Sequence, residues 1–263
     1  MAPYRAKKRL GQNFLVNDKI INSIIDQIDP EEDDVIIEIG SGRGALTLPL
    51  AENCHKLFAV EYDRDLIGYL EKLLAQYDNI ELVHADFLEY QPNVKKYKLV
   101  GNLPYNISSP VIEWAVAHRD EIVEGCFMLQ KEVALRLCAS AGSKDWSPLS
   151  IFTRIFFEVE LCFDISPKNF NPAPQVVSSL IKMKPKDQIN IPNYNLFEKV
   201  VRASFKQRRK TLLNNLSSEL FNSSEQAQSI IESAGFDPKI RAEQITIEQF
   251  LKLTELINLS KIN

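Results

Sequence analysis

The feature that most constrains the fold of this chain is the alternation of short β-rich runs with helical segments between residues 35 and 184. Each of the earlier runs is followed by a loop or a helix-forming segment: VIIEIG (35–40), KLFAVEY (56–62), IELVHAD (80–86), YKLVGN (97–102) and GCFMLQ (125–130). This alternation is typical of a mostly parallel sheet that is covered by helices on both faces. The sequence therefore predicts an α/β fold.

Two later runs complete the predicted sheet, IFFEVELCF (155–163) and SSLIKMK (178–184). The proline-bearing segment between them is too short for an ordinary crossover helix, so we expect the two strands to pair antiparallel. The prediction is a seven-stranded sheet, mostly parallel with one antiparallel strand. Ahead of the first strand, isoleucines at helical spacing in residues 17–28 predict a helix that packs on the sheet, with Asn17 as its N-cap.

Beyond residue 184 the pattern changes from strands to helices. The polar, proline-bearing segment PKDQINIPN (185–193) is followed by stretches that predict helices, such as VVRASFKQRRKTLLNNL (200–216) and TIEQFLKLTELI (246–257). We therefore expect two domains, one at residues 1–188 with a basic N-terminal arm and a small all-helical one at residues 189–263.

The charge of the chain confines any nucleic-acid contact to local patches. The net charge is −4 and the pI is about 5.6, which excludes a surface that is positive throughout. One basic patch lies in the first ten residues, and a second contains Arg202, Lys206, Arg208, Arg209 and Lys210. Most members of the second patch recur at helical spacing, which would gather positive charge on one side of a helix and bind an RNA backbone.

Several classes of protein are disfavoured by what the sequence lacks. No run approaches the roughly 18 apolar residues that a membrane-spanning helix needs, and the basic N-terminus has no apolar signal core behind it. The four cysteines are scattered, without a C-x-x-C pair or a histidine at ligand spacing. We expect a cytoplasmic protein with reduced thiols and no metal, and nothing in the sequence indicates an obligate assembly, so we expect a monomer.

A glycine-rich loop follows the first predicted strand, and two acidic residues follow the next two strands. Gly40, Gly42 and Gly44 let the backbone turn sharply and approach a ligand closely. Glu61, about 20 residues downstream, can accept hydrogen bonds from two ribose hydroxyls. Asp86, after the third strand, is suited to accept from an adenine amine. This layout resembles that of class I methyltransferases, which implies S-adenosylmethionine as cofactor.

The most specific signal is Asn102-Leu103-Pro104-Tyr105, after the fourth strand. It resembles the tetrapeptide of methyltransferases that act on planar amines. An adenine amine is a poor nucleophile because its lone pair is delocalised into the ring, so the site must accept both N–H hydrogen bonds. The Asn102 side-chain oxygen and a backbone carbonyl fixed by Pro104 can supply these acceptors, with Tyr105 stacked on the base. Positioning then supplies most of the catalysis, without metal or covalent nucleophile.

Motifs along nearly the whole chain resemble those of the KsgA-type rRNA adenine dimethyltransferases. They are KKRLGQNFL, NLPYNISSPV, MLQKEVALRL, VELCFDISPKNFNPAPQVVSSL, ASFKQRRKTLLNNL and RAEQITIEQFLKL. The resemblance implies dimethylation of two neighbouring adenosines in a hairpin near the 3′ end of small-subunit rRNA, within an immature ribosomal subunit. It also implies that Asn13 and Leu15 line the methionine end of the cofactor, and that Phe170 faces Tyr105 across a flipped base. Ser147, Pro148 and Val177 depart from the family pattern.

Three alternatives remain open from the sequence. One is a methyltransferase of the Erm group, which acts on large-subunit rRNA; the NLPYN motif and the late basic segment favour the KsgA-type interpretation. Another is a chiefly non-catalytic assembly factor or a transcription-factor relative, against which the intact tetrapeptide and cofactor loop argue. The last is a dinucleotide-dependent oxidoreductase, for which the sequence offers no hydride-transfer site.

Overall fold

The computed structural model describes residues 5–187 and 191–260. The chain divides into two compact units, one of Met1–Leu135 with Phe157–Pro185 and the other of Arg136–Phe156 with Lys186–Asn263. The domain boundary expected from the sequence, between residues 188 and 189, lies outside the described residues. The helical unit also takes in residues 136–156, which the sequence predicts as part of the first domain.

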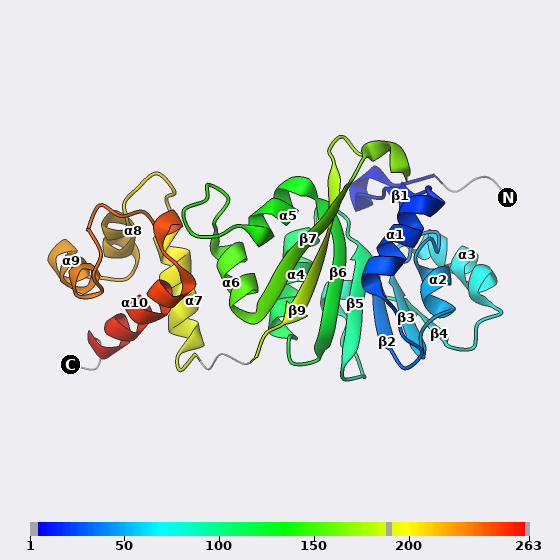
Figure 1. The fold of residues 1–263 in the computed structure, drawn as a ribbon, viewed down its shortest axis with the longest axis horizontal. Helices are drawn as coiled ribbons and strands as arrows, with labels where there is room; N and C mark the ends of the chain where they lie inside the picture. Colours follow the sequence, from blue (N-terminus) through cyan, green and yellow to red (C-terminus); the bar gives the residue numbers. More distant parts are fainter. Residues whose placement is uncertain (1–4, 188–190, 261–263) are drawn as a thin grey trace. The chain divides into compact units, whose positions relative to one another are not determined.

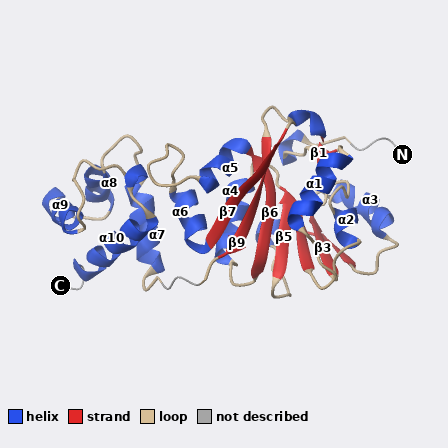
Figure 2. Cartoon of the chain, viewed as in Figure 1, coloured by secondary structure: helices blue, strands red, loops and turns tan. Residues whose placement is uncertain are grey.

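The first unit is built around a twisted seven-stranded sheet, drawn in red in Figure 2, in the order β4-β3-β2-β5-β6-β9-β7. Its strands are β2 (Val35–Ile39), β3 (Lys56–Glu61), β4 (Ile80–His84), β5 (Tyr97–Asn102), β6 (Ile122–Gln130), β7 (Phe157–Ile165) and β9 (Ser178–Pro185). β9 pairs antiparallel with both β6 and β7, and the other pairs are parallel. The predicted sheet is confirmed, including the antiparallel pairing of the last two strands.

Helices cover both faces of the sheet (Figure 1). They are α1 (Asp18–Ile28), α2 (Thr47–Ala51), α3 (Arg64–Leu74), α4 (Ser108–Ala117) and α5 (Lys131–Cys138), with the short 3₁₀ turns η1 (Lys8–Leu10), η2 (Phe87–Glu89) and η3 (Pro167–Asn169). The predicted cap of α1 is confirmed, because the Asn17 side chain accepts a hydrogen bond from the Lys19 amide. Ile24 and Ile28 of α1 are buried against the sheet, as the isoleucine spacing predicts.

A second small sheet ties the N-terminal arm, residues 5–15, to the loop between β7 and β9. β1 (Phe14–Leu15) pairs antiparallel with β8 (Phe170–Asn171). The same junction is held by Asn17, whose side chain donates to the Asn169 side-chain oxygen at 2.8 Å. Two segments about 150 residues apart in the sequence therefore lie side by side.

The second unit is helical. Its elements are α6 (Pro148–Phe156), α7 (Tyr194–Ser204), α8 (Leu212–Glu219), α9 (Ser224–Ser233), the 3₁₀ turn η4 (Ala242–Gln244) and α10 (Ile247–Ser260). Its core is aromatic and aliphatic, with Phe197 and Phe250 fully buried. The Trp146 ring nitrogen donates to the Ile245 carbonyl at 2.9 Å, which fixes the loop before α6 inside this unit.

The prediction that the late basic segment continues as a helix is wrong. α7 ends at Ser204, and Lys206, Arg208, Arg209 and Lys210 lie in the loop before α8. The reason is Asn215, a buried side chain of α8 that donates to the carbonyls of Ser204 and Gln207 at 2.7 and 3.2 Å. These bonds take up carbonyls at the end of α7 and favour a turn there.

The basic side chains of this segment differ in whether they form ion pairs with acidic side chains. Arg202 pairs with Glu198 at 2.9 Å, Lys206 lies 3.8 Å from Glu219, and Arg208 lies 3.6 Å from Glu243. Arg209 and Lys210 are exposed, and among residues 5–187 and 191–260 neither side chain has an ion-pair partner.

Within residues 5–187 and 191–260, no helix combines the length and the apolar character that a membrane span requires.

Candidate active site

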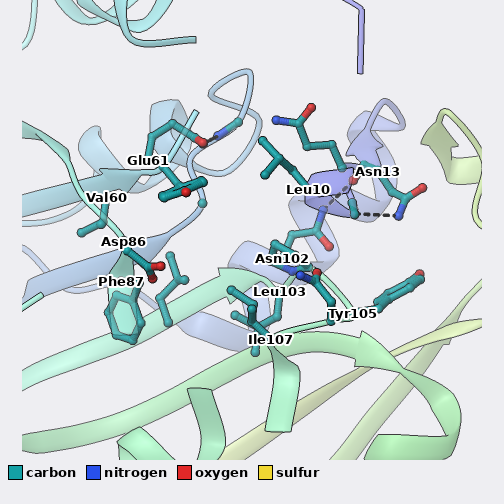
Figure 3. Close-up of a pocket in the computed structure, with 18 of the residues that line it drawn as sticks. Leu10, Asn13, Val60, Glu61, Asp86, Phe87, Asn102, Leu103, Tyr105 and Ile107 are labelled. Atoms are coloured by element: carbon teal, nitrogen blue, oxygen red, sulfur yellow. Dashed lines mark hydrogen bonds between the residues drawn. The ribbon is translucent and has the colours of Figure 1, made fainter. Parts of the chain in front are cut away.

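A cavity of about 310 Å³ lies at the carboxyl ends of β2, β3, β4 and β5. Its lining includes most of the cofactor-site residues expected from the sequence: Asn13, Gly40, Gly42, Glu61, Asp86 and Asn102. Figure 3 shows Glu61 and Asp86 along one side of the cavity and Asn13 and Asn102 along the other. Because parallel strands bring their carboxyl ends to one edge of the sheet, residues distant in the sequence share this site.

The glycine loop joins β2 to α2, and its residues Gly40 and Gly42 line the cavity. Gly40 has φ +74° and Gly42 has φ +57°, a region that other residues rarely adopt. A Cβ atom at Gly40 would meet no other atom within 4 Å, so open space lies beside the backbone at this part of the cavity wall. The loop can therefore hold a ligand against its main chain.

Glu61 is the buried acid of the site, with 6% of its surface exposed. One carboxylate oxygen accepts from the Gly42 amide at 2.8 Å and the other from the Asp63 amide at 2.7 Å. Burial raises the pKa of Glu61 above its ordinary value, while these two amides oppose the rise. The carboxylate oxygens also reach the cavity, where a remaining lone pair can accept a hydrogen bond from a bound ligand.

Asp86 stands at the end of β4, as expected from the sequence. Its Oδ1 accepts from the Leu88 amide at 3.0 Å, which caps η2 and fixes the side chain. Among the residues that the structure describes, its second oxygen makes no hydrogen bond, and it is available to a donor in the cavity.

Asn102 ends β5 and points its amide at the N-terminal arm. Its Nδ2 donates to the backbone carbonyl of Asn13 at 2.8 Å. Because the nitrogen of the amide is engaged by the arm, the oxygen is left as the end that can accept from a ligand. Pro104 follows in a tight turn, closed by the Ile107 amide, which donates to the Pro104 carbonyl at 3.0 Å.

Tyr105 also lines the cavity, and its hydroxyl lies 2.8 Å from the Ser178 hydroxyl of β9. This bond fixes the direction of the half-buried ring. Two other predicted residues are not among those that line the cavity. Leu15 and Phe170 pair in the small sheet, and both side chains are buried in the core beneath α1.

Several further residues line the cavity that the sequence motifs did not indicate. Leu10, Phe14, Val60, Tyr62 and Phe87 supply apolar surface to the cavity. Phe14 and Leu10 belong to the KKRLGQNFL motif, so the motif signalled the segment but not which of its side chains face inward. The others sit next to the acids Glu61 and Asp86, and this adjacency is the signal that could have found them.

The chemistry of these groups fits S-adenosylmethionine. An open glycine loop, a buried carboxylate for ribose hydroxyls and a second carboxylate beside apolar surface match the donor's charged amino-acid part, sugar and adenine. With the strand order of the sheet, the site defines the chain as a class I, S-adenosylmethionine-dependent methyltransferase. In the described part of the chain no cluster of three or more potential metal ligands is present.

The chain belongs to the ribosomal RNA adenine dimethylase family, whose model matches residues 4–259. A relative from Neisseria meningitidis serogroup B, named Ribosomal RNA small subunit methyltransferase A, is 39% identical over 261 residues, which is 98% of each chain. A relative of the same name from Hydrogenovibrio crunogenus is 39% identical over 271 residues, covering 99% of this chain and all of its own.

Solved structures agree with this assignment. The dimethyladenosine transferase from Plasmodium falciparum is 26% identical, with a TM-score of 0.83 over 94% of this chain and 98% of its own. The 23S rRNA methyltransferase ErmE is 25% identical, with a TM-score of 0.73 over 94% of this chain and 100% of its own. Both methyltransferases therefore share the fold of nearly the whole chain.

Proposed function

We propose that this protein transfers methyl groups from S-adenosylmethionine to the exocyclic amines of two adjacent adenosines in small-subunit rRNA, near its 3′ end and within an immature subunit. The observation that carries the proposal is the orientation of Asn102, whose amide nitrogen is held by Asn13 so that its oxygen can accept an N–H from the target. The names of the curated relatives support small-subunit rRNA as the substrate.

The cofactor roles follow from the hydrogen bonds at the cavity. When bound, S-adenosylmethionine supplies a methyl group on a positively charged sulfur. Glu61 would accept from its ribose hydroxyls, and Asp86 from its adenine amine. Asn13 and the loop of Gly40 and Gly42 would hold the amino-acid end. By the family resemblance Leu15 would also lie at the amino-acid end of the cofactor, although its side chain packs in the core.

The Asn102-Leu103-Pro104-Tyr105 turn would hold the target base. The Asn102 oxygen and the Leu103 carbonyl would accept the two amine N–H groups, which returns the nitrogen lone pair to the direction of attack. The Tyr105 ring, fixed by Ser178, would stack on the base after it leaves the RNA stack, and Phe170 would cover the opposite face. The lone pair would then attack the methyl carbon as the bond between that carbon and the donor sulfur breaks, which leaves the donor as a neutral thioether, and the proton of the methylated amine would pass to solvent.

The helical unit would supply the RNA backbone contacts through the loop that carries Lys206, Arg208, Arg209 and Lys210, with Arg202 in the helix before it. In this arrangement residues 1–188 act as the methyltransferase domain and residues 189–263 as the RNA-binding domain. We place the protein in the cytoplasm, where ribosomal subunits are assembled, and we propose that it acts as a monomer.

The test is transfer of labelled methyl from S-adenosylmethionine to immature small subunits, with large subunits and duplex DNA in parallel, for the wild type and Asn102→Ala. We expect labelled dimethyladenosine in small-subunit rRNA alone, and a loss of at least about 100-fold in the variant, because one acceptor of the reacting amine is removed. Labelling of large subunits would move the chain to the activity named for ErmE. Donor binding without any transfer would instead support an assembly factor.

A further inference from the structure

The N-terminal arm is fastened to the cofactor side of the cavity at one buried carboxylate. Lys7 Nζ lies 2.5 Å from Asp63 Oδ1, and the Gln12 side chain donates to Asp63 Oδ2 at 2.8 Å. The Lys7 backbone amide donates to the Gln12 side-chain oxygen at 2.8 Å, which closes the arm into a compact loop. Lys7 also pairs with Asp65 at 2.6 Å.

Asp63 is buried and is held in place by hydrogen bonds on both its backbone and its side chain. Only 3% of its surface is exposed, and its backbone amide donates to Glu61 at 2.7 Å. Its own carboxylate caps α3 by accepting from the Asp65 amide at 3.1 Å. An arm bonded to Asp63 is therefore held at a fixed position relative to Glu61.

The other contact of the arm is the turn proposed to hold the target base. The Asn13 carbonyl accepts from the Asn102 side chain at 2.8 Å. Gly11 packs on the same turn: a side chain there would come within 3.0 Å of the Asn106 side-chain oxygen and 3.5 Å of Pro104. The arm thus spans the distance between Asp63 and Asn102 with contacts at both ends.

We propose that Lys7, Gln12 and Asp63 are positioning residues for methyl transfer, which hold the arm so that the Asn13 carbonyl keeps the Asn102 amide oxygen directed at the reacting amine. The proposal rests on the proposed function in one respect, namely that Asn102 accepts an N–H of the target.

The physical reason is that an amide has two ends of nearly equal size and opposite hydrogen-bonding character. Without the Asn13 carbonyl, the Asn102 side chain can turn over and present N–H donors to a substrate amine that itself donates. Such an encounter disfavours the reactive geometry without weakening the binding of the RNA elsewhere. Loosening the arm should therefore lower kcat and leave the KM for RNA unchanged.

The arm could instead use Lys7 as a contact to an RNA phosphate. The geometry disfavours this, because Lys7 lies between two carboxylates, with its side chain only 27% exposed. Hydrogen bonds to Asp63 and Asp65 raise the pKa of Lys7 above its ordinary value, so its charge stays paired within the protein. A phosphate contact predicts the opposite kinetic pattern, a raised KM for RNA with kcat unchanged.

The experiment compares Lys7→Met and Gln12→Met with Lys7→Arg, which keeps the cation, in the full-length protein. Lys56→Met is the matched control, since Lys56 pairs with Glu81 at 3.6 Å elsewhere in the same unit. We expect kcat for methyl transfer to fall about fivefold to tenfold in Lys7→Met and in Gln12→Met, as the loss of one charge-assisted hydrogen bond to Asp63 predicts. Lys7→Arg should recover most of the rate, and Lys56→Met should not lower it.

A second readout does not depend on catalysis. Hydrogen exchange of the protein without RNA should show faster exchange in Lys7→Met for peptides covering residues 10–15 of the arm and also the turn at residues 102–108. Faster exchange in the arm alone, or a raised KM for RNA with unchanged kcat, would overturn the proposal. If the wild type methylates no RNA, the proposed function fails, and the exchange of the turn still decides whether the arm holds it.

Discussion

Asn102 and Asn13, which are 89 positions apart in the sequence, meet through one hydrogen bond from the Asn102 Nδ2 to the Asn13 carbonyl at 2.8 Å. Asn13 lies in the N-terminal arm and Asn102 at the end of β5, so the contact joins two segments that both line the cavity. The direction of this bond determines which end of the Asn102 amide can meet a substrate.

Asn102→Asp tests that relationship. The substitution keeps an acceptor for the target amine but puts a second oxygen against the Asn13 carbonyl, where two acceptors repel. The cost of such a mismatch is about 1–3 kcal/mol. We expect a rate of methyl transfer between those of the wild type and Asn102→Ala, measured in single turnover. A rate equal to the wild type would mean that the bond to Asn13 is not needed.

Glu61→Gln should weaken the binding of S-adenosylmethionine rather than slow the methyl-transfer step. The amide loses the charge and one of the acceptor sites that we assign to the ribose hydroxyls, and hydrogen bonds to charged groups contribute about 1.5–3 kcal/mol. The Kd for S-adenosylmethionine should rise about 10-fold to 100-fold by titration calorimetry. Glu81→Gln, on the exposed start of β4, is the control and should leave the Kd unchanged.

Glu38→Gln should change how stability depends on pH. Glu38 is 2% exposed beneath the glycine loop and accepts from the Thr47 hydroxyl at 2.6 Å. Burial raises the pKa of Glu38 to about 7, with a further contribution from the charge of Glu61. The folded protein therefore holds a proton between pH values near 4.5 and 7 that the unfolded chain has released, and stability falls as pH rises through that window.

Glutamine does not titrate, so Glu38→Gln should not lose stability as the pH rises through this window. The free energy of unfolding of Glu38→Gln, relative to the wild type, should increase by up to about 3 kcal/mol between pH 5 and pH 8. Denaturant unfolding at both pH values measures it. A difference that does not change with pH would show that Glu38 has no raised pKa in the folded state.

The double variant Arg209→Ala/Lys210→Ala should bind RNA more weakly than the wild type. Its affinity for RNA should also depend less on the salt concentration. These two exposed side chains have no ion-pair partner in the described part of the chain, whereas Arg208 faces Glu243. Loss of two phosphate contacts should reduce the slope of log K against log salt by about 1.5 to 2. Lys239→Ala, an exposed lysine of the same unit, is the control. Equal losses in both variants would contradict a specific role for the loop.

Phe170→Leu separates stacking from packing. The side chain is 4% exposed within the core, and leucine keeps most of the buried volume while removing the ring. If Phe170 covers the target base, kcat/KM for RNA should fall about 5-fold to 100-fold, the range for one base stacked on an aromatic ring. The Tm should stay close to that of the wild type. A lowered Tm with an unchanged rate would assign Phe170 to the core alone.

The strands and the cofactor loop could be predicted from the sequence because their signals are local. β5 occupies Tyr97–Asn102, as its apolar run predicts, and Asn17 caps α1 as its position before the isoleucine stripe predicts. The glycine loop and the acids after β3 and β4 follow strand ends, and parallel strands bring those ends together. Local pattern and sheet topology are enough for this part of the site.

The remaining features depend on contacts between distant segments. The basic run before α8 has helical spacing, but Asn215, which lies 11 positions after Ser204 and eight after Gln207, takes the carbonyls of both residues that a continued helix would use. Leu15 and Phe170 pair with each other in the small sheet, and the arm is fastened to Asp63, 56 positions from Lys7. The sequence by itself determined the sheet, because strand and helix periodicity encode it, and the resemblance of its local motifs to known ones indicated the cofactor type and the tetrapeptide that we propose to hold the target amine. Only the tertiary structure decided which side chains face the cavity and which end of the Asn102 amide is free, because hydrogen bonds between segments far apart in the chain set both.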